Sequence, residues 1–213
     1  MPFRIDLHVH SRDSGDNNAD PEESVIQAID RRLQGIAFTE HYSFGASEGA
    51  LRLAEKYRDR IVIIRGVEYS TPDGHCLIFG VDTDRLPLKD LTVQEIVTVV
   101  TGEGGAVIPS HPYRSVNSLG DRVKRLRGIA AVEGYNGCNM ALFNDRAVET
   151  ARMLSLPYTG GSDAHESRDV GACYTEFDAL VTPENLVGLL RAGRYRGVDT
   201  RKISKGFWSG FPS

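Results

Sequence analysis

The sequence has few of the residues that would build a disulfide framework or a membrane span. Its three cysteines, Cys76, Cys138 and Cys173, are widely spaced and form no paired motif, which predicts reduced thiols and a cytoplasmic location. No apolar run approaches the ~20 residues that a membrane helix needs. Asp6 and His8 interrupt the N-terminus, so we expect no secretory signal there.

The chain also lacks the excess of positive charge that nucleic-acid-binding domains usually carry. Its formal net charge is −4 at pH 7, so we expect a small-molecule partner, no extended nucleic acid and no membrane. The chain has 213 residues, of which 40% are hydrophobic and 25% are charged. This length and composition suit one large soluble domain with a full core.

Apolar strands and amphipathic helices alternate along the sequence. The run 61–64 has no polar residue, which is typical of a parallel strand covered on both faces. Asp20, Pro21 and Glu23 predict a helix start, as N-cap, first helical residue and partner in a capping box. We expect Gly35 to end that helix. Further helices are expected at 49–58, 92–102, 116–126, 140–154 and 183–190.

The recurring unit is a strand, a polar segment and a helix. This unit predicts a parallel α/β architecture. We favour a closed, TIM-like barrel over an open sheet, because polar strand ends from the whole chain must converge on one site, as they do in barrels. The barrel domain is expected at 1–195, followed by a C-terminal tail at 196–213.

The first strand carries two histidines on a regular alternation of apolar and polar residues. The apolar positions are Phe3, Ile5, Leu7 and Val9, and the polar positions are Arg4, Asp6, His8 and His10. A strand of this kind has one polar face, on which His8 and His10 point the same way. Two imidazoles on a rigid strand can begin a metal site, although an isolated pair could equally be two half-buried polar residues.

The remaining histidines favour the metal site. Five of the six lie where a predicted strand meets a loop, and the sixth begins a strand beside a turn; they are His8, His10, His41, His111, His165 and His75. A single histidine is more often a satisfied core or surface residue, but six in this arrangement indicate a site for several metals. Asp163 lies two residues before His165 and adds a carboxylate at the same spacing.

Glu68, at another strand end, suits a carboxylate that bridges two cations, with a solvated loop residue as the alternative. A site of histidines and carboxylates without thiolate predicts manganese, iron or zinc, with magnesium also possible.

Five segments, in this order, resemble the motifs of the PHP (polymerase and histidinol phosphatase) family; they are 6–11, 39–41, 66–68, 110–112 and 161–165. The resemblance implies a distorted (β/α)7 barrel with up to three metals at the C-terminal strand ends. It implies one metal on His8, His10, Glu68 and Asp163, a second on Glu68, His75 and His111, and a third on His41 and His165. Asp16 is our candidate for a further ligand of the third metal, with Asp13 behind it. Many family members have Asp where this chain has Glu40.

The resemblance further implies a metal-dependent phosphoesterase acting on a nucleotide-like or sugar phosphate, in which a metal-bridging hydroxide attacks phosphorus. We expect Glu68, His41, His165 and Asp16 to be catalytic, and Arg114, with Ser11 and Arg12 as weaker candidates, to bind the phosphate. One alternative is an amidohydrolase-like hydrolase of C–N bonds or lactones on the same metal barrel. A second alternative is a metal-bound regulatory module without turnover.

The expected tail is rich in aromatic residues. Phe207, Trp208 and Phe211 lie close together, and their apolar surface, at roughly 25 cal/mol per Å², is costly to leave in water. We expect the tail to pack on the barrel.

Overall fold

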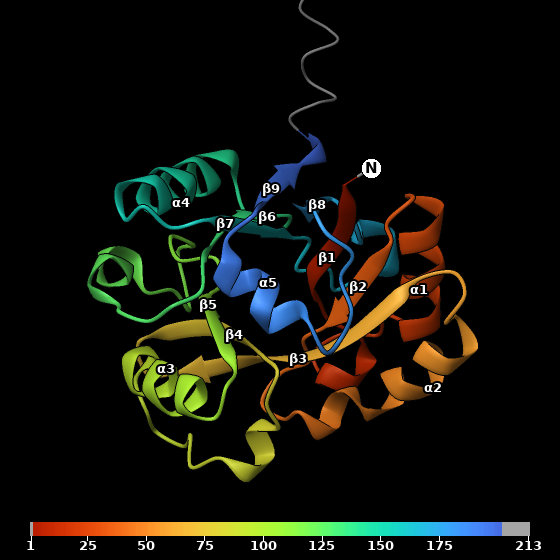
Figure 1. The fold of residues 1–213 in the computed structure, drawn as a ribbon, viewed down its shortest axis with the longest axis horizontal. Coiled ribbons are helices and arrows are strands. Elements are labelled where there is room, and N and C mark those ends of the chain that lie inside the picture. The colour runs from red at the N-terminus through yellow and green to blue at the C-terminus, as the bar shows by residue number, and fades with distance from the viewer. Residues whose placement is uncertain (1, 202–213) are drawn as a thin grey trace, which may run out of the picture.

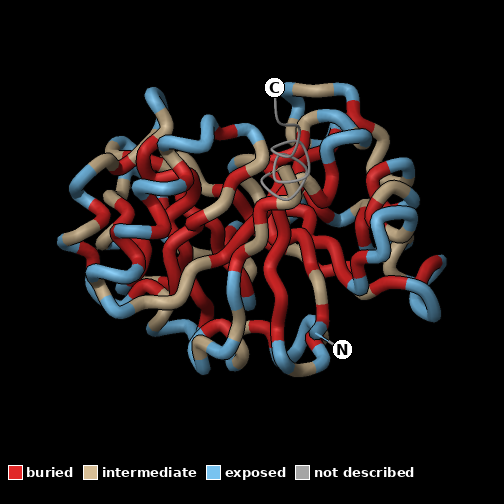
Figure 2. The backbone as a smooth tube through the Cα atoms, turned by 90° about the horizontal axis from the view of Figure 1, so that it is seen from above, coloured by how far each residue is buried: buried red, intermediate tan, exposed pale blue. Residues whose placement is uncertain are grey.

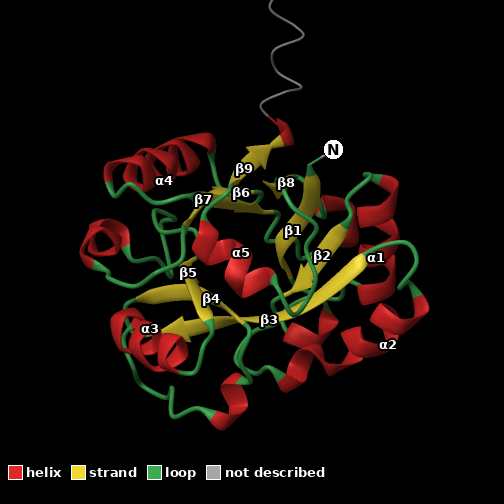
Figure 3. Ribbon diagram, viewed as in Figure 1, coloured by secondary structure: helices red, strands yellow, loops and turns green. Residues whose placement is uncertain are grey.

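β1 lies near the middle of a curled sheet in the computed structural model, which describes residues 2–201. The strands are β1 Phe3–Val9, β2 Gly35–Phe38, β3 Val62–Thr71, β4 Gly74–Phe79, β5 Ala106–Pro109, β6 Val132–Asn136, β7 Tyr158–Gly161, β8 Cys173–Phe177 and β9 Tyr195–Asp199. The α-helices are α1 Pro21–Asp30, α2 Gly49–Lys56, α3 Val93–Gly102, α4 Ala141–Met153 and α5 Leu186–Ala192. The helices surround the strands (Figure 1, Figure 3).

The strands form a seven-stranded sheet in the order β5-β4-β3-β2-β1-β8-β9 and a separate parallel pair, β6-β7. Only β1–β2 and β2–β3 are parallel in the larger sheet; its other neighbours are antiparallel. The prediction of an α/β domain is confirmed, whereas an all-parallel strand arrangement is wrong. The expected closed (β/α)7 barrel is not confirmed, because the strands form a curled sheet and a separate pair. A tight turn between Thr71 and Gly74 joins β3 directly to β4, which leaves no length for the crossover helix that parallel strands require.

Three apolar clusters hold this architecture together. One fills the concave side of the curl and includes Ile5, Leu7, Ala37, Ile64, Leu77, Ile108 and, from α5, Leu186 and Leu190. A second packs α1 and α2 against the convex side, and the third packs α3 and α4 against β4 and β6. α1 and α2 lie on one flank, α3 and α4 on the other, and α5 lies across the centre (Figure 1). The buried backbone follows the central strands (Figure 2).

An irregularity in β1 determines where its histidines point. Between Asp6 and Val9, β1 advances three residues while β2 advances two, from Ile36 to Phe38. Leu7 packs on the concave side, but Val9 packs with the α1 and α2 layer. The extra residue reverses the alternation, so His8 and His10 face the inside of the curl. The expectation of one continuous polar face along this strand is therefore wrong.

Several predicted boundaries also differ. α1 ends at Asp30, not at Gly35. Gly35 belongs to β2, where a Cβ would lie 2.8 Å from Ile5 Cδ1. The predicted helix 116–126 is reduced to a 3-10 helix at Gly120–Arg125.

The last strand of the sheet was not foreseen. β9 pairs with β8 from Tyr195 to Asp199, so the ladder continues past residue 195, where we placed the end of the barrel domain. Phe207, Trp208 and Phe211 lie outside the described residues, and their packing stays a prediction. Across residues 2–201, none of the helices combines the length and apolarity needed to cross a membrane.

Two glycines make opposite predictions for stability. Gly188 is exposed within α5, and a Cβ there would meet nothing within 4 Å, so Gly188→Ala should raise the free energy of unfolding by about 0.8 kcal/mol through helix propensity. A Cβ on Gly160 would strike the Tyr174 carbonyl oxygen, and Gly160→Ala should lower that free energy by about 2 kcal/mol. Urea denaturation of both variants measures the difference; equal midpoints would contradict the packing around β7.

Candidate metal centre

Polar side chains from six strands meet at one end of the curl and form three groups of potential metal ligands. The groups are His8, His10, Glu68 and Asp163; Glu68, His75 and His111; and His10, His41 and His165. Within each group the candidate ligand atoms lie within 4.8 Å of one another. We call them the first, second and third clusters. The structure thus brings together the residues of the predicted first and second ligand sets, which share Glu68. His10 belongs to the first cluster and also lies beside His41 and His165 in the third.

The first cluster is fully buried and pairs two imidazoles with two carboxylates. His8 Nε2 and His10 Nε2 are 3.0 Å apart. Both nitrogens lie 3.4 Å from Asp163 Oδ1, and they lie 3.5 and 3.3 Å from Glu68 Oε2. Close approach is possible because β7 ends in Gly161, where a Cβ would strike His8 Cβ.

Glu68 lies between the first and second clusters. Its Oε2 faces His8 and His10, whereas its Oε1 is 2.7 Å from His111 Nε2 and 3.3 Å from His75 Nδ1. The two oxygens of one buried carboxylate therefore point at different groups of nitrogens. This is the arrangement that a carboxylate bridging two cations requires.

The third cluster is more open to solvent. Asp16 Oδ2 lies 3.2 Å from Nε2 of both His41 and His165, so Asp16 rather than Asp13 carries these contacts. Burial raises the pKa of Asp16, but the nearby His165 and His41 lower it by more, so the pKa lies below its ordinary value. A carboxyl group that stays ionised suits a ligand better than a proton donor.

Several buried atoms in the clusters have no hydrogen-bond partner. They are Asp163 Oδ1 and the Nδ1 atoms of His41, His75 and His111. Unpaired buried polar atoms are costly. Cations bound by Asp163 Oδ1, His41 Nδ1 and His75 Nδ1 would remove that cost, whereas His111 faces the second cluster with its other ring nitrogen, Nε2. His111 and Asp163 also have positive φ angles of 30° and 54°, a strained backbone of the kind that accumulates at functional sites. The donor set therefore fits divalent cations.

The charges of the first cluster are mutually dependent. Burial alone would lower the pKa of His8, but the carboxylates of Asp163 and Glu133 raise it well above its ordinary value. Burial likewise lowers the pKa of His10, but the nearby carboxylates of Asp163 and Glu68 raise it to about 9. Conversely, burial would raise the pKa of Glu68 and of Asp163, but His8 and other histidines hold both well below their usual range. Without a cation, these histidines hold protons that a cation must displace.

Glu133 is a functional residue that the sequence analysis did not identify. It is buried on β6 and accepts hydrogen bonds from His8 Nδ1 at 2.8 Å and from the His111 backbone N–H at 2.6 Å. Asn136 Nδ2 also donates to it, at 3.0 Å. A carboxylate on the far nitrogen fixes the tautomer and orientation of a ligating histidine. Its position directly after a short apolar run in the sequence was the available signal.

The three predicted phosphate-binding residues have different surroundings. Arg114 forms an ion pair with Asp163 Oδ2, and its Nε donates to Asn139 Oδ1 at 3.2 Å. Ser11 is buried and its hydroxyl donates to Glu40, while Arg12 pairs with Asp20 at 2.6 Å. We therefore retain only Arg114 as a phosphate-binding candidate.

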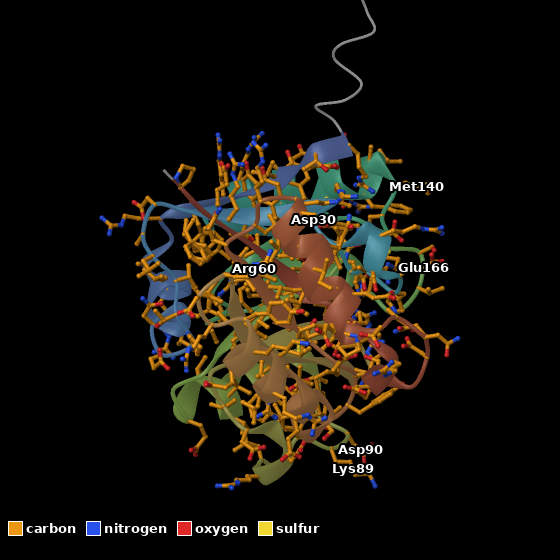
Figure 4. All side chains as sticks on the ribbon, turned by 90° about the vertical axis from the view of Figure 1, so that its right-hand side faces the viewer. Asp30, Arg60, Lys89, Asp90, Met140 and Glu166 are labelled. Carbon is orange, nitrogen blue, oxygen red and sulfur yellow. The ribbon has the colours of Figure 1, made fainter. Side chains whose placement is uncertain are left out.

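The loops beside the clusters reach the surface. Met140 and Glu166 directly follow Asn139 and His165 in the chain, and both lie on the same side of the molecule (Figure 4). Met140 is 64% exposed, so this side of the site is open to solvent.

Comparisons with known proteins agree with this geometry. The model of the PHP domain matches residues 6–115, and the PHP-associated model matches residues 141–195. PsfC from Pseudomonas syringae has a similar structure, with a TM-score of 0.69 and 20% identity, covering 96% of this chain and 94% of its own.

Two further solved structures share the fold. A Bifidobacterium adolescentis protein, provisionally described as a metal-dependent phosphoesterase, gives a TM-score of 0.64 at 17% identity and covers 93% of this chain and 98% of its own. An amidohydrolase from Chromobacterium violaceum, with bound sulfate and no metal, gives 0.63 at 18% identity and covers 90% of this chain and 96% of its own.

Metal binding should release protons. Because the pKa of His10 is raised to about 9, a cation entering the first cluster at pH 7.5 must displace at least one proton, and affinity should fall as the pH is lowered from 9. Calorimetric titration of metal-free protein with zinc, in two buffers of different ionisation enthalpy, measures the release. It should be smaller for His10→Gln. Equal heats in both buffers would contradict this assignment.

Proposed function

Because the chain belongs to the PHP domain family, whose model matches residues 6–115, we propose that it is a metal-dependent phosphoesterase that hydrolyses a small phosphate ester. The observation that carries this proposal is Glu68, whose two carboxylate oxygens face two different histidine clusters. Phosphoester hydrolases with paired cations need such a shared ligand to hold the ions ~3.5–4 Å apart.

The clusters suit two or three ions of manganese, iron or zinc, since their ligands are imidazoles and carboxylates without thiolate. Bound divalent cations activate water and neutralise charge on phosphoryl oxygens. His8, His10 and Asp163 would hold one ion with Glu68, and His75 and His111 would hold the second. His41, His165 and Asp16 would hold the third, beside the leaving group on the more exposed side of the site.

Arg114 would orient the phosphate. Its side chain is 25% exposed, and its guanidinium reaches the first cluster through Asp163. A guanidinium has five N–H donors, so donors remain for a phosphoryl oxygen beside those on Asp163 and Asn139. The cationic fork would also stabilise negative charge that develops on the phosphoryl group. The ligand class is a nucleotide-like or sugar phosphate small enough to enter between the loops.

A second candidate function is hydrolysis of an amide or lactone, because the Chromobacterium violaceum neighbour is an amidohydrolase. Among residues 2–201 the lysines are Lys56 in α2, Lys89 in a loop and Lys124 in the 3-10 helix Gly120–Arg125. None of them lies at a strand end, and a lysine carbamate is the usual bridging ligand in that group. The sulfate bound to that neighbour is itself a tetrahedral oxyanion, like a phosphate. We therefore favour the phosphoester.

A substrate panel tests the proposal directly. Manganese-loaded protein should hydrolyse p-nitrophenyl phosphate or its diester analogues and should leave acyl amides and lactones intact. Hydrolysis confined to amides or lactones would support the second candidate. Metal binding without any turnover on phosphate metabolites would support a regulatory module and overturn the proposal.

Loss of the shared carboxylate should be more damaging than loss of a third-cluster histidine. Glu68→Gln removes a charge that faces both the first and second clusters, so we expect kcat to fall about 100-fold, equivalent to ~2.7 kcal/mol in the barrier. His41→Ala should cost roughly tenfold. Steady-state kinetics with the surface variant Glu103→Gln as control measures both. A Glu68→Gln enzyme with wild-type turnover would refute the mechanism.

The role of Arg114 can be separated from its contact with Asp163. Arg114→Lys keeps the positive charge but loses the planar fork, so KM for a phosphate ester should rise about tenfold. Metal content measured by elemental analysis should stay at the wild-type value. Arg146→Lys is a suitable control, because Arg146 is exposed and pairs with Asp121. If metal content falls together with activity, Arg114 holds Asp163 rather than substrate.

A further inference from the structure

Hydrogen bonds to the buried carboxylate of Glu40 hold the loop after β1 close to the end of β2. Glu40 is 1% exposed. It accepts hydrogen bonds from the Ser11 backbone N–H at 3.0 Å and from Ser11 Oγ at 2.6 Å. Ser14 Oγ donates to the same carboxylate. The carboxylate therefore holds both ends of the segment 11–14 against the strand end.

The hydroxyl group of Ser14 has a fixed hydrogen-bond direction in this arrangement. Glu40 Oε2 accepts from the Ser11 backbone N–H, which can only donate, and Ser14 Oγ donates its one hydrogen to the same oxygen. The Ser14 oxygen can then only accept from its other neighbours. These are His10 Nδ1 at 3.1 Å and the His41 backbone N–H at 3.2 Å. Consequently the hydrogen between Ser14 and His10 must belong to His10 Nδ1.

A neutral imidazole protonated at Nδ1 has its lone pair at Nε2. His10 Nε2 is the atom that faces the first cluster, 3.3 Å from Glu68 Oε2 and 3.4 Å from Asp163 Oδ1. We infer that Glu40 and Ser14 are positioning residues that fix the tautomer and orientation of His10 and thereby present Nε2 to a cation. The inference rests on the metal site of the proposed function and goes beyond it by assigning residues outside the ligand set.

The two histidines of the first cluster are thus oriented by different hydrogen bonds. His8 Nδ1 lies 2.8 Å from the carboxylate of Glu133, which orients it directly. His10 Nδ1 reaches its carboxylate, Glu40, only through the hydroxyl of Ser14. Outer residues of this kind typically affect metal affinity by about 10–100-fold.

Ser14 also connects the first cluster to the third. The same oxygen that accepts from His10 accepts from the backbone N–H of His41. His41 belongs to the third cluster, to which His10 also contributes. Loss of this single hydroxyl should therefore weaken metal binding in both clusters and leave the second cluster, built on His75 and His111, unchanged.

The experiment uses the full chain with Ser14→Ala, Ser14→Thr and Ser43→Ala. Ser43 is the matched control, because its hydroxyl also donates to a carboxylate, Asp84, at 2.9 Å in a neighbouring loop. Zinc affinity is measured by competition with a chelator. Ser14→Ala should bind the zinc ions of the first and third clusters about tenfold less tightly, Ser14→Thr should restore binding, and Ser43→Ala should match the wild type.

A second readout reports the tautomer itself. In zinc-loaded, ¹⁵N-histidine-labelled protein, long-range ¹H–¹⁵N spectra should show His10 protonated at Nδ1, with a proton that exchanges faster with solvent in Ser14→Ala. Zinc on Nδ1 with a proton on Nε2 would overturn the inference. Unchanged zinc affinity and exchange in a folded Ser14→Ala protein would overturn it as well.

Measuring phosphatase turnover in parallel separates this inference from the proposed function. Zinc affinity that depends on Ser14 in a protein without turnover on any phosphate ester would support the positioning role and count against the phosphoesterase. If the protein hydrolyses phosphate esters but its zinc affinity does not change in Ser14→Ala, the phosphoesterase is supported and the positioning role is refuted.

Discussion

The rest of the structure depends on the burial of negative charge at one end of the curl. Glu68 and Asp163 are each 1% exposed, and an ionised carboxylate buried without partners is strongly unfavourable. His8 and His10, whose pKa values are raised, supply protons that balance this charge, and the other histidines offer nitrogen ligands for cations. The loops after β1, β3, β5 and β7 are therefore constrained by charge balance as well as by packing. This constraint explains why Asp163 and His111 persist in a strained backbone.

Much of the site could be predicted because most of its ligands lie at or next to strand ends, where strand pairing brings side chains to a common edge. His8, His10 and Asp163 follow from that placement. Glu68 lies inside β3 and not at the expected strand end, so it follows from the resemblance to a known family. Ser11 and Arg12 show its limit, since closeness in sequence to His10 did not indicate where their side chains point. Glu133 was missed because a single glutamate after a short apolar run has no companion motif in the sequence; it is the second residue of β6.

The fold was harder to predict from the sequence than the site. Alternating strands and helices predicted an α/β domain, but strand direction and register depend on contacts between distant segments. The irregularity between Asp6 and Val9 is set by how β1 packs on β2 and between two cores, and no local pattern encodes it. Gly35 was read as a helix end, although its small size is needed beside Ile5. The sequence pattern of a helix stop and that of a close strand contact are the same here.

The reversal within β1 has a consequence for local opening of the molecule. Leu7 is packed in the concave core and Val9 in the layer under α1 and α2, so one strand is anchored in two cores. Fraying of either layer alone leaves the other half of the strand in place. The backbone amides of β1 should then exchange with solvent only when both cores come apart, which makes the histidine-bearing strand part of the slowest-exchanging unit of the fold.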